Sequence, residues 1–285
     1  MKLGQFEIRT FVEQRFKLDG GSMFGVIPKT MWDKLWPSDE HNLIPMVTNL
    51  FVLKAHGKNM IFDLGLGDAL SPREKKVYGT DGISSLIPGL KSLGLTPNDV
   101  DIVILTHLHT DHCGGAVTRE GDRYVPRFRK ARYIISRSEW EAAIHPDERT
   151  SAVYIAARLL PLEEAGQIQF IDEDTELFPG IKAVRTSGHT DDHFALEIES
   201  EGRQLFYYAD IFPSRHHMRV PFVPATDLLP KETMRVKREA LTRIVNKGVI
   251  MAFDHDIEAP LAEFTEQDGK LIAHPIDERT GQRKS

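Results

Sequence analysis

The sequence has little cysteine, no long apolar run and no excess of positive charge. Its single cysteine, Cys113, excludes an internal disulfide and is typical of a reducing compartment. Residues 1–10 lack the uninterrupted apolar core of a signal peptide, and no later stretch is long enough to span a membrane. We therefore expect a cytoplasmic protein that is not attached to a membrane.

The charge balance is acidic, with a net charge of −6 and a pI near 6.1. This balance argues against nucleic acid as a partner. A length of 285 residues and a hydrophobic content of 41% allow a substantial core. Strands and helices alternate without a low-complexity linker, which favours one α/β domain over residues 1–285, with helices covering the outside of paired sheets.

Short β-branched and aromatic runs predict strands, and longer periodic stretches predict helices. The chain is expected to open with a hairpin of residues 6–18 and 22–28, because Asp19, Gly20 and Gly21 indicate a turn. Further strands are predicted at 48–54, 59–63, 101–106, 131–135, 167–171, 181–185, 193–198, 204–208 and 249–253, and helices at 83–93, 138–144, 151–164 and 231–246.

Four potential metal ligands lie within six residues, directly after the strand predicted at 101–106. They are His107, His109, Asp111 and His112. A helix would separate His107 and His109 by about 200° at roughly 100° per residue, whereas an extended strand end points both the same way. Gly114 and Gly115 follow and allow backbone to pack closely. We interpret this histidine cluster as a strand-to-helix turn that forms the first half of a two-metal site.

Three later strand ends also carry histidine or aspartate. His189 follows Gly188, Asp210 follows the run that ends at Tyr208, and His255 follows the strand at 249–253. Loops at strand ends let a rigid sheet aim side chains that are distant in sequence at one place. Imidazole and carboxylate are common ligands of zinc, manganese, iron and cobalt, and a bridging carboxylate lets two ions lie about 3.5–4 Å apart.

The order and spacing of these residues resemble the metallo-β-lactamase superfamily. Within it, residues 19–28 and the closing stretch 253–256 resemble the branch of quorum-quenching lactonases and methyl-parathion-hydrolase-like enzymes. The resemblance implies a four-layer αββα sandwich. It also implies two divalent metal ions, with zinc expected and manganese, iron or cobalt as alternatives.

The same resemblance assigns the ligands. One ion would be held by His107, His109 and His189, and the other by Asp111, His112 and His255, with Asp210 bridging them. Asp63, at the end of the strand at 59–63, would hold a histidine ligand through its ring N–H, as carboxylates commonly do. Asp254 and Asp256 are alternative candidates to support His255 in this way.

The implied reaction is hydrolysis by a hydroxide that bridges the two metals. Asp111 would orient this hydroxide and pass a proton to the leaving group. The expected substrate is a small lactone or carboxylic ester, with an organophosphate triester as a neighbouring alternative. Homodimerisation through the N-terminal region is a further expectation from the resembling branch.

Departures from the family patterns reduce the number of activities that the sequence is compatible with. Class B β-lactamases have cysteine or histidine where this chain has Asp210, which argues against antibiotic hydrolysis. Lactonases place a tyrosine three residues after the bridging aspartate, where this chain has Pro213. The residues that could replace it are Tyr208, His216 and His217, and the residues that could form a substrate pocket are Met23, Phe24, Phe212 and His216.

Two rival functions stay open at this point. A phosphodiesterase or nuclease of the same fold would need a basic groove, which the acidic composition disfavours. A non-catalytic module that binds metal for sensing would be expected to lack a bridging or water-orienting ligand. Because Asp111 and Asp210 are both present, the sequence favours the metal-dependent hydrolase.

Overall fold

The computed structural model describes residues 1–284. Its contacts divide the chain into two compact units. Unit 1 comprises Met1–Phe6, Phe16–Val47 and the chain from Asp174 onward, and unit 2 comprises Glu7–Arg15 and Thr48–Glu173. The prediction of one domain over residues 1–285 stays a prediction.

A seven-stranded sheet carries most of unit 2, in the order β1-β2-β3-β4-β5-β8-β9. Its strands are β1 (Lys2–Leu3), β2 (Phe6–Asp19), β3 (Leu43–Ala55), β4 (Lys58–Phe62), β5 (Ile102–Ile104), β8 (Arg132–Ser136) and β9 (Ile168–Ile171). β2 and β3 each contribute residues to both units. β4 and β5 are parallel, with Met60 opposite Ile102, so the residues after these strands emerge at the same edge.

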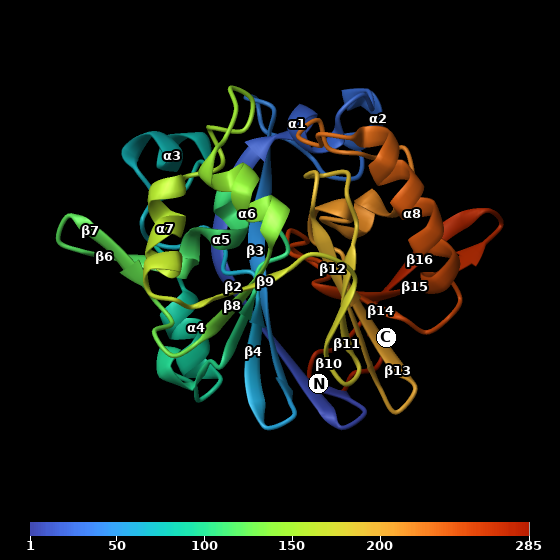
Figure 1. The fold of residues 1–285 in the computed structure, drawn as a ribbon. Helices are drawn as coiled ribbons and strands as arrows, with labels where there is room; N and C mark the ends of the chain where they lie inside the picture. Colours follow the sequence, from blue (N-terminus) through green and yellow to red (C-terminus); the bar gives the residue numbers. More distant parts are fainter. Residues whose placement is uncertain (285) are drawn as a thin grey trace. The chain divides into compact units, whose positions relative to one another are not determined.

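Helices cover one face of this sheet (Figure 1). Leu86 and Leu90 of α4, Trp140 of α6 and Leu159 and Leu162 of α7 pack in one core with apolar residues of β3, β4, β5 and β8. The other short elements of unit 2 are a β6/β7 hairpin and several helical turns. The bounds are α3 (Pro72–Val77), α4 (Leu86–Ser92), η1 (Pro97–Asp99), α5 (Thr110–Cys113), η2 (Gly114–Ala116), β6 (Val117–Glu120), β7 (Arg123–Pro126), α6 (Arg137–Ile144) and α7 (Ala156–Glu164).

Unit 1 contains the second seven-stranded sheet, in the order β10 to β16. Its strands are β10 (Thr175–Phe178), β11 (Ile181–Arg185), β12 (Phe194–Ser200), β13 (Arg203–Tyr207), β14 (Ile250–Ala252), β15 (Leu261–Gln267) and β16 (Lys270–Pro275). Val236, Ala240 and Ile244 of α8 (Pro230–Ile244) pack on this sheet (Figure 1). β13 and β14 are parallel, which brings the residues after both strands to one edge.

The opening hairpin is the main error in the sequence analysis. β2 is a strand as predicted, but residues 22–28 are not its partner. Asp19 instead accepts hydrogen bonds from the N–H groups of Gly21 and Ser22 and caps the short helix α1 (Gly20–Phe24). A second helical turn, α2 (Lys29–Trp32), follows. A capping aspartate before two glycines thus starts a helix here rather than a hairpin turn.

Other differences are at element ends and in short strands. α7 begins at Ala156, five residues after the predicted start, and the strands β6, β7, β10, β15 and β16 were not expected. Within residues 1–284, no helix has the length and apolar composition required to cross a bilayer.

Candidate metal centre

The histidine cluster is a strand-to-helix turn, as predicted. β5 ends at Ile104, and the one-turn helix α5 begins at Thr110, with His109 at its N-cap. Close packing of Gly114 and Gly115 holds the turn, since a Cβ at either position would collide with the backbone of residues 64–66. The chain cannot carry larger side chains here without moving the turn.

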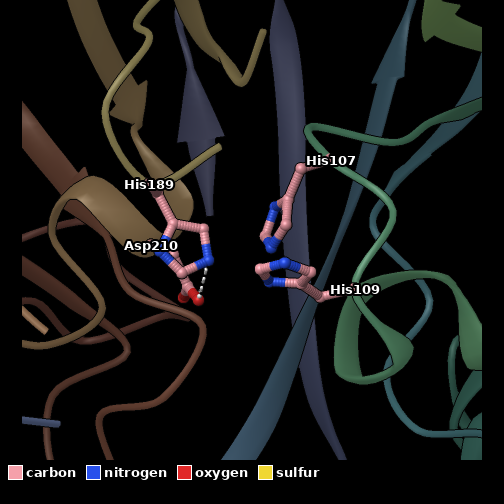
Figure 2. A group of neighbouring side chains, drawn as sticks. All are labelled: His107, His109, His189 and Asp210. Atoms are coloured by element: carbon pink, nitrogen blue, oxygen red, sulfur yellow. Dashed lines mark ion pairs between the residues drawn. The ribbon is translucent and has the colours of Figure 1, made fainter. Parts of the chain in front are cut away.

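The imidazoles of the cluster are buried and close together. The ring centroids of His107 and His109 are 4.7 Å apart, and those of His107 and His112 are 3.9 Å apart. The ligand atoms of His107 and His109 lie within 4.8 Å of each other (Figure 2). Asp111 is half-buried on the first turn of α5. Buried imidazoles at this spacing fit a divalent cation, because each offers a neutral nitrogen lone pair without adding positive charge.

Asp63 lies beside the histidine cluster, directly after β4. Its carboxylate accepts hydrogen bonds from the backbone N–H and the hydroxyl of Thr106, both at 2.8 Å, and lies 3.0 Å from Nδ1 of His112. Asp63 also has a left-handed backbone, with φ of 49°. A carboxylate at Nδ1 fixes the ring so that Nε2 is the ligand atom, the arrangement common around metal sites.

A second buried carboxylate, Glu139 of α6, supports the same turn and was not singled out from the sequence. Its Oε1 accepts from the backbone N–H of Leu108 at 2.9 Å and from the hydroxyl of Tyr154 at 2.7 Å. The ring of Tyr154 lies 5.1 Å from that of His109. Glu139 follows Ser136 by three residues, the spacing of a helix N-terminal capping box. That spacing accounts for a glutamate here without a contact to the ligand turn, so the sequence gives no sign of the contact.

His189 is the first candidate ligand of unit 1, and two carboxylates flank its ring. Nε2 lies 3.0 Å from Oδ2 of Asp210, the pair joined by the dashed line in Figure 2, and Nδ1 lies 2.9 Å from Oδ1 of Asp227. Burial disfavours the charged ring, but the two carboxylates outweigh it and raise the pKa of His189 to about 10. The surroundings of this ring therefore favour a cation.

Asp227 was missed by the sequence analysis. It is buried in the loop before α8, and its Oδ2 accepts from the hydroxyl of Thr233 at 2.5 Å. Gly188 lies against Thr233 so closely that a Cβ at residue 188 would collide with it, and its φ is 143°. Gly188 thus lets the loop that carries His189 approach α8. Residues 225–229 contain no sequence motif that would have indicated the role of Asp227.

Asp210 and His255 follow the parallel strands β13 and β14. Asp210 lies in the short helix η3 (Ala209–Ile211), and the preceding Ala209 has a left-handed backbone with φ of 40°. Nδ1 of His255 lies 2.8 Å from the carbonyl oxygen of Val47, which leaves Nε2 as the ligand atom, 3.3 Å from Oδ1 of Asp210. The atom at Nδ1 of His255 is therefore a backbone carbonyl oxygen, and not a carboxylate of Asp254 or Asp256 as predicted; Asp254 lies on the Nε2 side of the ring.

The donor set of unit 1 also fits a divalent cation. The ligand atoms of Asp210, Asp254 and His255 all lie within 4.8 Å of one another, and each residue is buried. Two carboxylates buried side by side carry a large desolvation cost unless positive charge compensates them. An ion with a charge of +2 matches this need.

The proposed pocket residues occupy different environments. Phe24 is buried and stacks on Trp32 and on His217, with ring centroids 5.2 and 4.8 Å apart. Phe212 is buried in the core beneath α8, and Met23 is also buried. His216 is half-buried, and its ring centroid lies 5.7 Å from that of Trp36. Burial and the positive charge of Arg215 lower the pKa of its imidazole. The role of all four in a pocket stays a prediction.

The three candidates to replace the lactonase tyrosine differ in what their polar atoms do. The hydroxyl of Tyr208 donates to Glu197 at 2.8 Å, on the side of the sheet that α8 covers. His217 has Nδ1 2.8 Å from the hydroxyl of Ser214 and Nε2 2.9 Å from the carbonyl oxygen of Met23. These bonds commit Tyr208 and His217 to the fold, so His216 is the better candidate.

Lys237 of α8 has a buried amine. Its Nζ donates to the carbonyl oxygen of Phe222 at 2.5 Å and lies 5.2 Å from the ring centroid of Phe212. Burial lowers its pKa to about 7, although Asp227 acts in the opposite direction. Lys237 therefore anchors the segment that leads to Asp227.

Comparison with known proteins places this chain in a family. A sequence model described as the metallo-beta-lactamase superfamily matches residues 43–255. An N-acyl homoserine lactonase of Bacillus cereus is 26% identical over 230 residues, which cover 76% of this chain and 84% of that protein. The range 43–255 that the family model matches contains all seven proposed ligands.

Solved structures agree. A probable metal-dependent hydrolase from Staphylococcus aureus superposes with a TM-score of 0.89 at 30% identity, over 95% of this chain and 96% of that one. AidC, a dizinc quorum-quenching lactonase, has a TM-score of 0.79 at 18% identity, over 97% and 96% of the two chains. These matches confirm the predicted fold and enzyme class: the chain belongs to the metallo-β-lactamase superfamily and is a metal-dependent hydrolase.

Proposed function

We propose that this protein is a dinuclear lactonase or carboxylic esterase. The observation that carries the proposal is the shared arrangement of His112, His189 and His255. Each ring is buried, and each has Nδ1 against a carboxylate or carbonyl oxygen, so that Nε2 is the atom offered to a metal. A protein that did not bind metal would have no need to orient three rings alike.

The proposed ligand sets follow the family pattern. His107, His109 and His189 would hold one ion, Asp111, His112 and His255 would hold the other, and Asp210 would contribute its carboxylate to both. Zinc is the proposed metal, and AidC, a dizinc lactonase of the same fold, supports this choice. When bound, two such cations supply a nucleophilic water at neutral pH and polarise the carbonyl under attack.

The protein's own groups then direct the reaction. Asp111 is half-buried at the start of α5, and we assign it the role of orienting the attacking water and passing a proton to the leaving oxygen. Asp63 and Asp227 hold the rings of His112 and His189 in place. His216, a half-buried imidazole, is assigned to the carbonyl oxygen of the substrate, in place of the tyrosine that Pro213 replaces.

The proposed substrate is a small lactone, with an aryl or alkyl ester next and an organophosphate triester as a neighbouring alternative. The Bacillus cereus relative is an N-acyl homoserine lactonase, which supports a lactone first. Homodimerisation and a cytoplasmic location stay predictions.

Metal analysis paired with a substrate panel tests the proposal. Purified protein is assayed by elemental analysis, and the same sample is offered a lactone, an aryl ester, a phosphotriester and a phosphodiester, before and after chelation. Two metal equivalents with chelator-sensitive lactone or ester turnover are expected. Turnover of the phosphodiester alone would overturn the substrate class, turnover that survives metal removal would overturn the mechanism, and bound metal without any turnover would favour a sensing module.

A further inference from the structure

Asp254 lies in the loop after β14, between Phe253 and the proposed ligand His255. Hydrogen bonds fix the backbone on both sides: the N–H of Phe253 donates to the carbonyl of Pro260 at 2.9 Å, and the N–H of His255 donates to that of Pro213 at 3.1 Å. The carboxylate of Asp254 is buried, with 3% of the residue exposed. Its position is therefore set by the fold.

The distances around Asp254 match those between neighbouring ligands of one metal ion. Its Oδ2 lies 3.5 Å from Nε2 of His255, and the same Nε2 lies 3.3 Å from Oδ1 of Asp210. At metal–ligand distances of about 2.1 Å, two ligand atoms at a tetrahedral angle are about 3.4 Å apart. All three side chains present their ligand atoms within 4.8 Å of one another.

Asp256 gives a comparison within the same loop. It is equally buried, with 3% of the residue exposed, but its Oδ1 accepts from Arg215 Nη1 at 2.8 Å and from the N–H groups of Glu258 and Ala259 at 3.0 and 2.9 Å. The charge of Asp256 is thus matched by an arginine and serves to close the loop. The carboxylate of Asp254 lies instead beside an imidazole that is proposed to bind metal.

We propose that Asp254 is a direct ligand of the ion held by His255, in addition to the family's ligands. This inference rests on the dinuclear site proposed above. A further carboxylate oxygen makes this position richer in oxygen donors, which manganese and other hard cations accept more readily than nitrogen-rich sites do. Asp254 thus adds to the difference between the two positions, and the position beside it takes up Mn²⁺ in competition with Zn²⁺ more readily than the other does.

The test compares Asp254→Asn with Asp256→Asn as its matched control, using metal binding rather than turnover. Both variants and the wild-type chain are stripped of metal and titrated with Zn²⁺ and with Mn²⁺ against a competing chelator dye. The visible absorption of each Co²⁺-loaded protein is then recorded. Thermal melting and circular dichroism show whether each variant is folded.

Asp254→Asn is expected to lower the Mn²⁺ affinity of one of the two positions by at least about tenfold, to lower Zn²⁺ affinity less, and to change the Co²⁺ spectrum. Asp256→Asn is expected to lower the melting temperature while leaving the spectrum unchanged. If Asp254→Asn is unfolded, Asp254→Glu takes its place, with an altered Co²⁺ spectrum expected from the displaced oxygen.

Three results would overturn the inference. If the wild-type chain binds two ions but the Asp254 variants keep its spectrum and affinities, Asp254 is not a ligand and the dinuclear proposal stands. If both Asp254→Asn and Asp256→Asn change the spectrum alike, the effect comes from distortion of the loop. A wild-type chain that binds fewer than two ions would refute the dinuclear site itself, and this inference with it.

Discussion

The two units supply their proposed ligands in different ways. In unit 2 the ligands belong to one turn, and two carboxylates, Asp63 and Glu139, hold that turn from outside. In unit 1 the ligands come from three separate loops, after β11, β13 and β14, and each needs its own support. Local sequence can therefore define the first group, whereas the fold must assemble the second.

This difference determines where a mutation acts. The turn of unit 2 is fixed by glycine packing and backbone hydrogen bonds, so losing one supporting carboxylate leaves other constraints. His189 depends on Asp227 and His255 on the carbonyl oxygen of Val47, and both partners come from segments remote in sequence. We therefore expect substitution of a supporting residue to lower metal affinity more in unit 1 than in unit 2.

The largest expected effect is that of Asp210→Asn, in the dispersed ligand group of unit 1. Removing the charge of the proposed bridge is expected to lower metal content and kcat/KM together, by more than the roughly 10–100-fold typical of outer partners. Asp111→Asn, in the unit 2 turn, is expected to lower kcat about 10²–10⁴-fold with less loss of metal. Elemental analysis and kinetics on the same samples check both. Equal metal loss in the two variants would contradict the assigned roles.

Next in size is a matched pair of supporting carboxylates. Asp227→Asn and Asp63→Asn each remove one carboxylate from Nδ1 of a proposed ligand, and metal affinity is expected to fall about 10–100-fold. Asp227→Asn is expected to be the more severe, because Asp63 shares its task with the constraints on the turn. Chelator competition measures the two affinities. A larger effect at Asp63 would reverse the comparison between the units.

A smaller effect is expected for Glu139→Gln. Glutamine keeps an oxygen for the N–H of Leu108 but loses the charge that strengthens this bond and the one from Tyr154. The free energy of unfolding is expected to fall by about 1–3 kcal/mol, with the metal content of the folded protein little changed. Urea unfolding of the metal-loaded protein measures the loss. Extensive metal loss in the folded variant would show that the turn is less robust than its packing indicates.

The sequence alone is enough to propose the ligands of unit 2, whereas those of unit 1 needed the resemblance to a family. The four residues from His107 to His112 share one short segment, so their spacing alone indicates a strand-to-helix turn. His189, Asp210 and His255 were proposed by resemblance to the family, since each alone is a common residue at a strand end. Asp227 and the carbonyl of Val47 leave no local pattern, because their contacts depend on how distant loops pack.

The strands also fall into a group that the sequence predicts and a group that it does not. The long apolar strands were predicted, whereas β6, β7, β10, β15 and β16 were missed, because they are rich in charged residues or lie in irregular stretches. The opening hairpin was wrong because glycine pairs occur both in turns and at the starts of helices. The side chain of Asp19, which the sequence cannot place, decides between them.

The smallest effect concerns the pH dependence of stability through Lys237 in unit 1. Its pKa is near 7 in the folded protein and 10.5 in an exposed chain, so between these values the unfolded state binds more protons and stability rises with pH. Lys237→Met removes this term. Its melting temperature is expected to rise less than that of the wild-type chain between pH 7 and 9.5, and identical pH profiles would refute the titration.

Ala209, the first residue of η3, has a left-handed backbone, a conformation that costs a residue with a Cβ about 1–2 kcal/mol. Unfolding releases this strain, so glycine at position 209 would give a more stable chain unless its freedom in the unfolded state offsets the gain. Directed evolution that selects only for heat resistance could thus replace Ala209 with glycine. Asp63, equally left-handed but hydrogen-bonded to His112, would resist the same exchange under any selection that requires catalysis.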